Sequence, residues 1–162
     1  MNQIPDQVGV AVMTVSDTRD SVSDRTGPWL REQIAAEGHA VIDHAIVHDQ
    51  VELIQAQLRS WIADKTIHAV IATGGTGLTG RDVTPEAFKA LYDKEMDGFS
   101  AVFHQVSFKS VGVSTIQSRA TAGIAGGTYL FAIPGSMGGC RDAWNHVLKA
   151  EFDLTHRPCN LV

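Results

Sequence analysis

The chain has 162 residues, of which 44% are hydrophobic and 19% are charged, and its formal net charge is −5 at pH 7. This composition is typical of a globular protein with one domain, here residues 1–162, and not of a disordered chain. The negative charge argues against a protein that coats nucleic acid, because such proteins need a basic surface. An anionic ligand must therefore be held locally, by backbone amides, a few arginines or a metal ion.

Cysteine content and hydropathy indicate the cellular compartment. The two cysteines, Cys140 and Cys159, could pair or remain free, but so low a count suits the reducing cytosol better than a disulfide scaffold. No apolar run approaches the ~20 residues needed to cross a bilayer. Residues 1–9 contain no Lys or Arg and no apolar signal-peptide core. We expect a cytoplasmic protein with no membrane partner.

The first half of the chain alternates strands with helices. Apolar, β-branched runs predict strands at 8–15, 40–47 and 68–73. After a polar loop, Pro28 occupies a position typical of the first residue of a helix, and Gly38 is a suitable stop. Apolar residues at helical spacing predict a second helix over 51–63. This alternation predicts parallel strands joined by right-handed helical crossovers.

The second half continues this alternation and adds a hairpin. Thr84 and Pro85 provide a helix start, and a helical stripe follows beyond residue 91. Two short strands, 119–125 and 128–133, flank a Gly-Gly dipeptide that permits a tight turn. One strand of the sheet should therefore be antiparallel. A last helix is predicted over about 139–152.

The segment between the third strand and the next helix has the build of a phosphate-binding turn. Residues 73–86 read Thr-Gly-Gly-Thr-Gly-Leu-Thr-Gly-Arg-Asp-Val-Thr-Pro-Glu. Glycine admits positive φ and lets a ligand approach the backbone, so that successive N–H groups can converge on an anion. The simpler alternative is a turn with helix-capping polar residues.

Two known glycine motifs fit this segment poorly. Gly75, Gly77 and Gly80 match the dinucleotide fingerprint in spacing, but four residues separate Gly80 from the Pro85 helix start. That fingerprint requires its third glycine in the opening turn of the helix. A P-loop requires Lys and Ser or Thr after the last glycine, and this chain has Arg81 and Asp82 there. A nicotinamide-dependent oxidoreductase remains a hypothesis based on the glycine spacing alone.

Other polar turns are expected at the same edge of the sheet, because ligands of such folds gather at the carboxyl ends of strands. Residues 16–19, Ser-Asp-Thr-Arg, follow the first strand, and residues 134–136, Pro-Gly-Ser, follow the last. Asp49 follows the second strand and could share a divalent cation with Asp82, since carboxylates are hard ligands that suit Mg²⁺. Each of these residues could also serve only as a turn or cap.

These segments together resemble the molybdenum cofactor biosynthesis proteins that bind molybdopterin, a family that includes molybdopterin adenylyltransferase. The similarity covers nearly the whole chain and is carried by residues 73–86, by Ser16-Asp17, by Ser118-Arg119 and by Pro134-Gly135. It implies a Rossmann-like, three-layer α/β/α fold and assembly as a homotrimer or homohexamer. It also implies transfer of AMP from Mg-ATP to the terminal phosphate of molybdopterin, with release of pyrophosphate.

The resemblance also assigns roles. Asp82 and Asp49 would be the catalytic, Mg²⁺-positioning carboxylates. The other residues would bind the substrates, with the amides of 74–77 serving the nucleotide and most of the others the pterin. This set comprises Ser16, Asp17, Thr73, Gly74, Gly75, Thr76, Gly77, Ser118, Arg119, Pro134, Gly135 and Ser136.

A second hypothesis comes from the same resemblance. Residues 140–160 are similar to a branch of the family in which some members keep the fold and pocket without catalysing adenylylation. Ser136-Met137 also replaces the x-Pro that follows Pro-Gly in the established adenylyltransferases. The alternative to an enzyme is therefore a molybdopterin-binding or scaffold protein of the same pathway.

Overall fold

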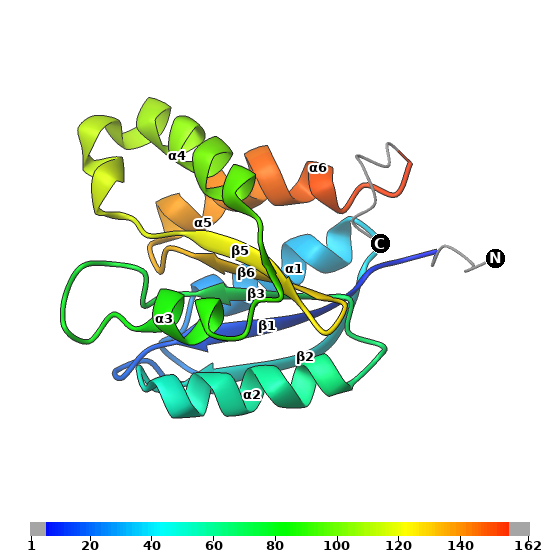
Figure 1. The fold of residues 1–162 in the computed structure, drawn as a ribbon. Helices are drawn as coiled ribbons and strands as arrows, with labels where there is room; N and C mark the ends of the chain where they lie inside the picture. The colour runs from blue at the N-terminus through cyan, green and yellow to red at the C-terminus, as the bar shows by residue number, and fades with distance from the viewer. Residues whose placement is uncertain (1–5, 156–162) are drawn as a thin grey trace.

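The computed structural model describes residues 6–155, which form one six-stranded sheet between two layers of helices (Figure 1). The strand order is β2-β1-β3-β6-β5-β4. The strands are β1 (Gly9–Val15), β2 (Ala40–Val47), β3 (Ala69–Thr73), β4 (Lys94–Glu95), β5 (Thr121–Ala125) and β6 (Thr128–Ile133). The helices are α1 (Thr26–Ala36), α2 (Val51–Ala63), α3 (Thr84–Lys89), α4 (Asp97–Val111), the 3₁₀ helix η1 (Gly112–Gln117), α5 (Met137–Ala143), the π helix η2 (Trp144–Leu148) and α6 (Lys149–Glu151).

The strand directions confirm the predicted fold class. β1 pairs in parallel with β2 and β3, and β3 pairs in parallel with β6. β5 is antiparallel to both of its neighbours, β6 and β4, so it alone runs against the rest of the sheet. The hairpin turns at Gly126 and Gly127, whose φ angles of 56° and 84° suit the left-handed turn that favours glycine.

Each face of the sheet has its own core. Side chains of α1, α4 and α5 pack on one face, where Phe131 lies 5.3 Å from Phe99 and 5.8 Å from Phe152 between ring centroids. Side chains of α2 and α3 pack on the other face, with Trp61 and Phe88 among the buried residues. Because both faces are covered, all seven residues of β1 are buried, as its continuous apolar run predicts.

Several predicted boundaries agree with the structure and others move. β2, α2 and β6 have the predicted bounds, and Gly38, with φ of 84°, ends the turn after α1. However, α1 begins at Thr26, so Pro28 is its third residue and not its first. The Asp24 carboxylate accepts the Gly27 N–H at 3.3 Å and stabilises this earlier start. Pro28 still lies within the first turn, where a missing N–H costs no helical hydrogen bond.

The predicted last helix differs most from its sequence pattern. It begins at Met137, since the Ser136 hydroxyl accepts the Gly139 N–H, and a π turn interrupts it over Trp144–Leu148.

No helix within residues 6–155 is long and apolar enough to cross a membrane. Cys140 is a buried core residue of α5, and Cys159 lies outside the described residues.

Candidate functional site

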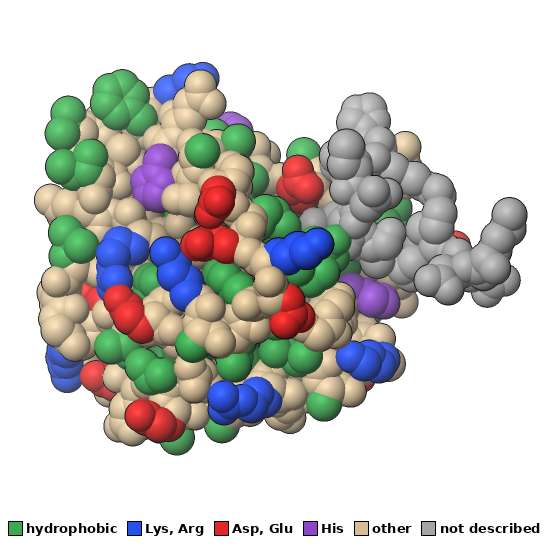
Figure 2. Space-filling view, viewed as in Figure 1, with side chains coloured by type: hydrophobic (Ala, Val, Ile, Leu, Met, Phe, Trp, Pro, Cys, Tyr) green, Lys and Arg blue, Asp and Glu red, His purple; other side chains and the backbone are tan. Residues whose placement is uncertain are grey.

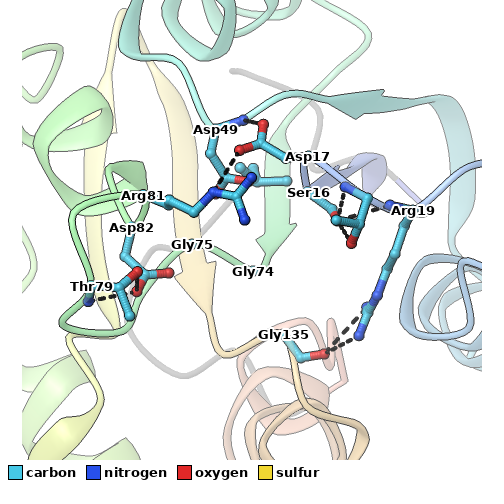
Figure 3. A pocket seen from close by; sticks show the side chains of 12 residues that line it. Ser16, Asp17, Arg19, Asp49, Gly74, Gly75, Thr79, Arg81, Asp82 and Gly135 are labelled. Atoms are coloured by element: carbon cyan, nitrogen blue, oxygen red, sulfur yellow. Dashed lines mark hydrogen bonds and ion pairs between the residues drawn. The ribbon is translucent and has the colours of Figure 1, made fainter.

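A cavity of about 350 Å³ opens at the carboxyl edge of the parallel strands. Loops after four strands, β1, β2, β3 and β6, contribute its walls, so segments far apart in sequence meet there (Figure 3). This is the edge at which the sequence predicts a ligand. The lining residues are Val15, Ser16, Asp17, Thr18, Arg19, Asp49, Gly74, Gly75, Thr79, Arg81, Asp82 and Gly135.

The floor of the cavity is backbone that only glycine can form. Gly74 and Gly75 have φ angles of 107° and 68°. A Cβ on Gly74 would lie 2.3 Å from the Val15 carbonyl oxygen, and a Cβ on Gly75 would lie 2.2 Å from the Thr84 hydroxyl. A Cβ on Gly135 would lie 3.0 Å from the Cα of Gly74. The chain therefore brings three backbone segments together where side chains would separate them.

The amides of the glycine loop are not equivalent. The Gly74 N–H donates to the Ile133 carbonyl at 3.0 Å and is occupied within the protein. The N–H groups of Gly75, Thr76 and Gly77 have no acceptor among residues 6–155. Of these three residues, Gly75 lines the cavity, so its amide is placed to receive an anion there.

Asp82 is held at the cavity by its own loop. One of its oxygens, Oδ2, accepts both the Thr79 N–H at 2.9 Å and the Thr79 hydroxyl at 2.8 Å. A Cβ on Gly77 would lie 2.8 Å from the same oxygen, so glycine is needed there to seat the carboxylate. The other oxygen of Asp82 remains available to a ligand.

Asp49 is the carboxylate whose environment penalises negative charge. Burial, followed by the nearby Asp17 and Asp82 carboxylates, raises the pKa of Asp49, and the Arg81 guanidinium opposes this shift. Asp17 accepts the Asp49 N–H at 3.0 Å and pairs with His48 at 3.5 Å and with Arg81 at 3.4 Å. The cavity therefore concentrates carboxylates that a cation would stabilise.

The donor set fits a Mg²⁺ ion that is shared with a substrate. Among residues 6–155 no group of three or more His, Cys, Asp or Glu side chains is arranged to hold a metal ion unaided. Mg²⁺ is commonly bound by one or two carboxylates together with water and substrate phosphates, and Asp49 and Asp82 meet that requirement. Burial and the neighbouring carboxylates, which together raise the pKa of Asp49, are consistent with such a site.

Several predicted site residues lie beside the cavity instead of lining it. The Thr73 hydroxyl donates to the Pro134 carbonyl at 2.9 Å, which ties the ends of β3 and β6 together. The Ser136 hydroxyl accepts the Gly139 N–H at 3.1 Å and caps α5. The buried Thr76 accepts the Arg119 N–H at 2.9 Å through its carbonyl.

Arg119 supports the glycine loop from outside the cavity, and its neighbour Ser118 contacts α4. The Arg119 guanidinium donates to the Gly77 carbonyl at 2.8 Å and to the Asp82 carbonyl at 2.9 Å, and it pairs with Glu86. The Ser118 carbonyl is 2.9 Å from Nε2 of His104. Arg119 therefore joins both ends of the loop that presents Asp82.

The structure adds lining residues that were not in the predicted set. Arg19 contacts the Gly135 carbonyl with both terminal nitrogens at 3.4 Å, and Arg81 reaches toward Asp17 (Figure 3). Both arginines lie next to or near predicted site residues in the same loops, which is the signal that could have identified them. The dinucleotide fingerprint does not match the geometry, because Gly80 lies before α3 and outside its first turn.

Comparison with known proteins identifies the family. A family described as "Probable molybdopterin binding domain" matches residues 11–153, which is most of the chain. The chain belongs to this molybdopterin-binding family. The family's match includes every loop that lines the cavity.

Individual relatives match this chain over nearly their full length. Molybdenum cofactor biosynthesis protein B from Escherichia coli K12 is 45% identical over 151 residues, which cover 93% of this chain and 89% of that protein. A crystal structure of a molybdenum cofactor biosynthesis protein B has a TM-score of 0.87 at 39% identity, covering 92% of this chain and 93% of the other. The tungsten cofactor synthesizing protein MoaB from Pyrococcus furiosus has a TM-score of 0.78 at 34% identity, covering 91% and 94%.

Proposed function

We propose that this protein binds molybdopterin and Mg-ATP in the cavity at the sheet edge and transfers AMP to the pterin, acting as a nucleotidyltransferase. Membership of the molybdopterin-binding family supports a role in molybdenum cofactor biosynthesis. The observation that carries the finer proposal is that Gly75, whose amide has no acceptor among residues 6–155, lines the same cavity as Asp49 and Asp82. Amides suit phosphate oxygens, and the two carboxylates suit a divalent cation.

The reaction requires little covalent chemistry from the protein. An oxygen of the pterin's terminal phosphate attacks the α-phosphorus of ATP, the bond between that phosphorus and the bridging oxygen breaks, and pyrophosphate leaves. A phosphate nucleophile is already ionised at neutral pH, so the protein mainly positions groups and neutralises charge. A Mg²⁺ ion held by Asp49 and Asp82 would supply that neutralisation. Gly75, Thr76 and Gly77 would orient the nucleotide phosphates through their amides.

The pterin would occupy the side of the cavity formed by the first and last loops. Ser16 and Asp17 line it after β1, and Gly135 lines it after β6. Pro134, Ser136 and Ser118 would contribute indirectly, by fixing the turns that carry or adjoin these residues.

Pyrophosphate release with purified molybdopterin and Mg-ATP tests the proposal. Wild-type protein should release pyrophosphate, and Asp82→Asn should fold normally but lose most turnover, because its amide binds Mg²⁺ more weakly. Unchanged product formation by the variant would exclude the metal role. Pterin binding without pyrophosphate release at saturating Mg-ATP would instead select the non-catalytic scaffold.

We also propose that the protein forms a homo-oligomer, a homotrimer or homohexamer, in the cytoplasm. Large apolar side chains gather at the end of α4 and along η1 (Figure 2), where Phe108, Val111, Val113 and Ile116 are 56%, 54%, 69% and 74% exposed. Contiguous exposed apolar surface commonly marks a protein interface. The low cysteine count suits a reducing compartment.

A further inference from the structure

Three arginines surround the glycine loop and the cavity, and two of them are committed to the protein itself. The Arg119 side chain is 32% exposed and directs its guanidinium at two carbonyls of the loop and at Glu86. The Arg19 guanidinium spans from the Thr26 hydroxyl to the Gly135 carbonyl. Both groups stabilise loop positions, so fewer of their donors are free to bind a ligand.

Arg81 is different, because most of its donors are unused. Its side chain lines the cavity and is 72% exposed. Only Nε has a partner, Asp17 Oδ2 at 3.4 Å, and neither terminal nitrogen has an acceptor within the part of the chain that the structure describes. The guanidinium reaches over the cavity from the loop that also carries the unpaired amides (Figure 3).

The Asp17 carboxylate has partners other than Arg81. It also accepts the Asp49 N–H at 3.0 Å and contacts Nδ1 of His48 at 3.5 Å. An exposed ion pair of this length contributes little to stability. A guanidinium binds a phosphate through two parallel N–H donors, which is a stronger arrangement than a single contact through Nε. The Arg81 guanidinium should therefore bind a phosphate group in preference to the Asp17 carboxylate.

The charge of the cavity restricts which anion can enter. Asp17, Asp49 and Asp82 face Arg19 and Arg81, so carboxylates outnumber guanidinium groups among the lining residues. A bare polyphosphate would be repelled by this excess, whereas one carrying a divalent cation would supply the missing positive charge to Asp49 and Asp82. Arg81 would then be released from the carboxylates and free to meet the phosphates.

We propose that Arg81 is a ligand-binding residue that exchanges Asp17 for the phosphate groups of a Mg²⁺-bound nucleoside triphosphate. The exchange rests on the proposed function and adds to it a side chain that recognises the nucleotide. Arg81 contacts the ligand in the loaded protein, while Arg119 remains a positioning residue for the loop.

Calorimetric titration with Mg-ATP, without molybdopterin, tests this exchange. The variants are Arg81→Gln and Arg81→Lys, and the matched control is Arg59→Gln, which replaces an exposed arginine on α2 outside the cavity. Loss of charge-assisted hydrogen bonds should weaken Mg-ATP binding by Arg81→Gln about tenfold or more. Arg81→Lys should fall between wild type and Arg81→Gln, since lysine keeps the charge but not the fork. The control should bind like wild type.

The possible failures are distinguishable. If wild type binds Mg-ATP and Arg81→Gln binds it equally well, the exchange is wrong while nucleotide binding by the cavity stands. If wild type does not bind Mg-ATP, both the exchange and the proposed adenylyl transfer are overturned. Melting temperatures check that all variants fold, and they should agree within about 2 °C because the Arg81 ion pair is exposed.

Discussion

At the scale of single residues, the glycine loop contains glycines that its backbone conformation requires and one, Gly80, that it does not. Gly74 has φ of 107° and would place a Cβ 2.3 Å from the Val15 carbonyl, whereas Gly80 has no atom within 4 Å of such a Cβ. Gly74→Ala should lower the free energy of unfolding by about 2 kcal/mol or more, because it adds both strain and a backbone clash. Gly80→Ala is the control and should change it by about 0.5 kcal/mol or less. Equal effects in urea denaturation would contradict this account of the loop.

Asp49 should show a conflict between stability and function. Its raised pKa means that the folded protein holds the Asp49 proton more tightly than the unfolded chain does. The stabilising contribution of this proton is present below the unfolded value of about 3.9 and is lost as pH rises through the folded pKa, leaving a penalty on the ionised group at neutral pH.

Asp49→Asn should therefore raise the melting temperature at pH 7 by about 1–3 °C, and this gain should disappear near pH 3. Thermal denaturation at the two pH values checks the prediction. A variant that is less stable than wild type at pH 7, or one whose gain persists at low pH, would show that Asp49 is stabilising when ionised.

At the scale of elements, the junction between the glycine loop and α3 depends on a buried hydroxyl. Thr84 Oγ1 donates to the Gly74 carbonyl at 2.9 Å, whereas the buried Thr115 Oγ1 in η1 has no partner among residues 6–155. Thr84→Val should cost about 1–3 kcal/mol of stability, because it leaves a buried carbonyl without its donor. Thr115→Val removes a group that is already unsatisfied and should be neutral or stabilising. Chemical denaturation of both variants would refute this if the two costs were equal.

Elements with strong local patterns could be predicted from sequence, and those created by tertiary contacts could not. The observed bounds of β2 and α2 match the prediction because an apolar, β-branched run marks the strand and apolar residues at helical spacing mark the helix. β4 has two residues, too few for any pattern, and forms because Lys94 and Glu95 pair with β5. The amino-acid composition of Trp144–Leu148 does not distinguish its π turn from an ordinary α-helix. The early start of α1 depends on the Asp24 side chain, which sequence position alone does not reveal.

In the candidate site, too, some features could be predicted from sequence and others depend on tertiary contacts. The convergence of its loops could be predicted because parallel strands bring their carboxyl ends to one edge. Which side chains enter the cavity could not, since Thr73 and Ser136 turn to neighbouring backbone while Arg81 turns inward. The resemblance assigns Arg119 to substrate binding, and sequence alone does not reveal that its guanidinium donates to the Gly77 and Asp82 carbonyls. The two Arg119 contacts join residues that are 42 and 37 positions apart in sequence.

At the scale of the whole molecule, the exposed apolar end of α4 and η1 should control assembly. Ile116 is 74% exposed, so glutamate there would not disturb the core but would oppose burial in an interface. Ile116→Glu should shift the protein from oligomer toward monomer in light scattering, with unchanged secondary structure. An unchanged molar mass, or a monomeric wild type, would exclude this surface as the interface.

The most direct test of the account is an amide NMR titration of the protein with Mg-ATP. We predict that the resonance of Gly75 and those of its neighbours Thr76 and Gly77 shift most, because their N–H groups have no acceptor in the described structure and Gly75 lines the cavity that also contains Asp49 and Asp82. Unchanged resonances there, together with shifts around the separate cavity lined by Glu37, His39 and Lys149, would contradict it.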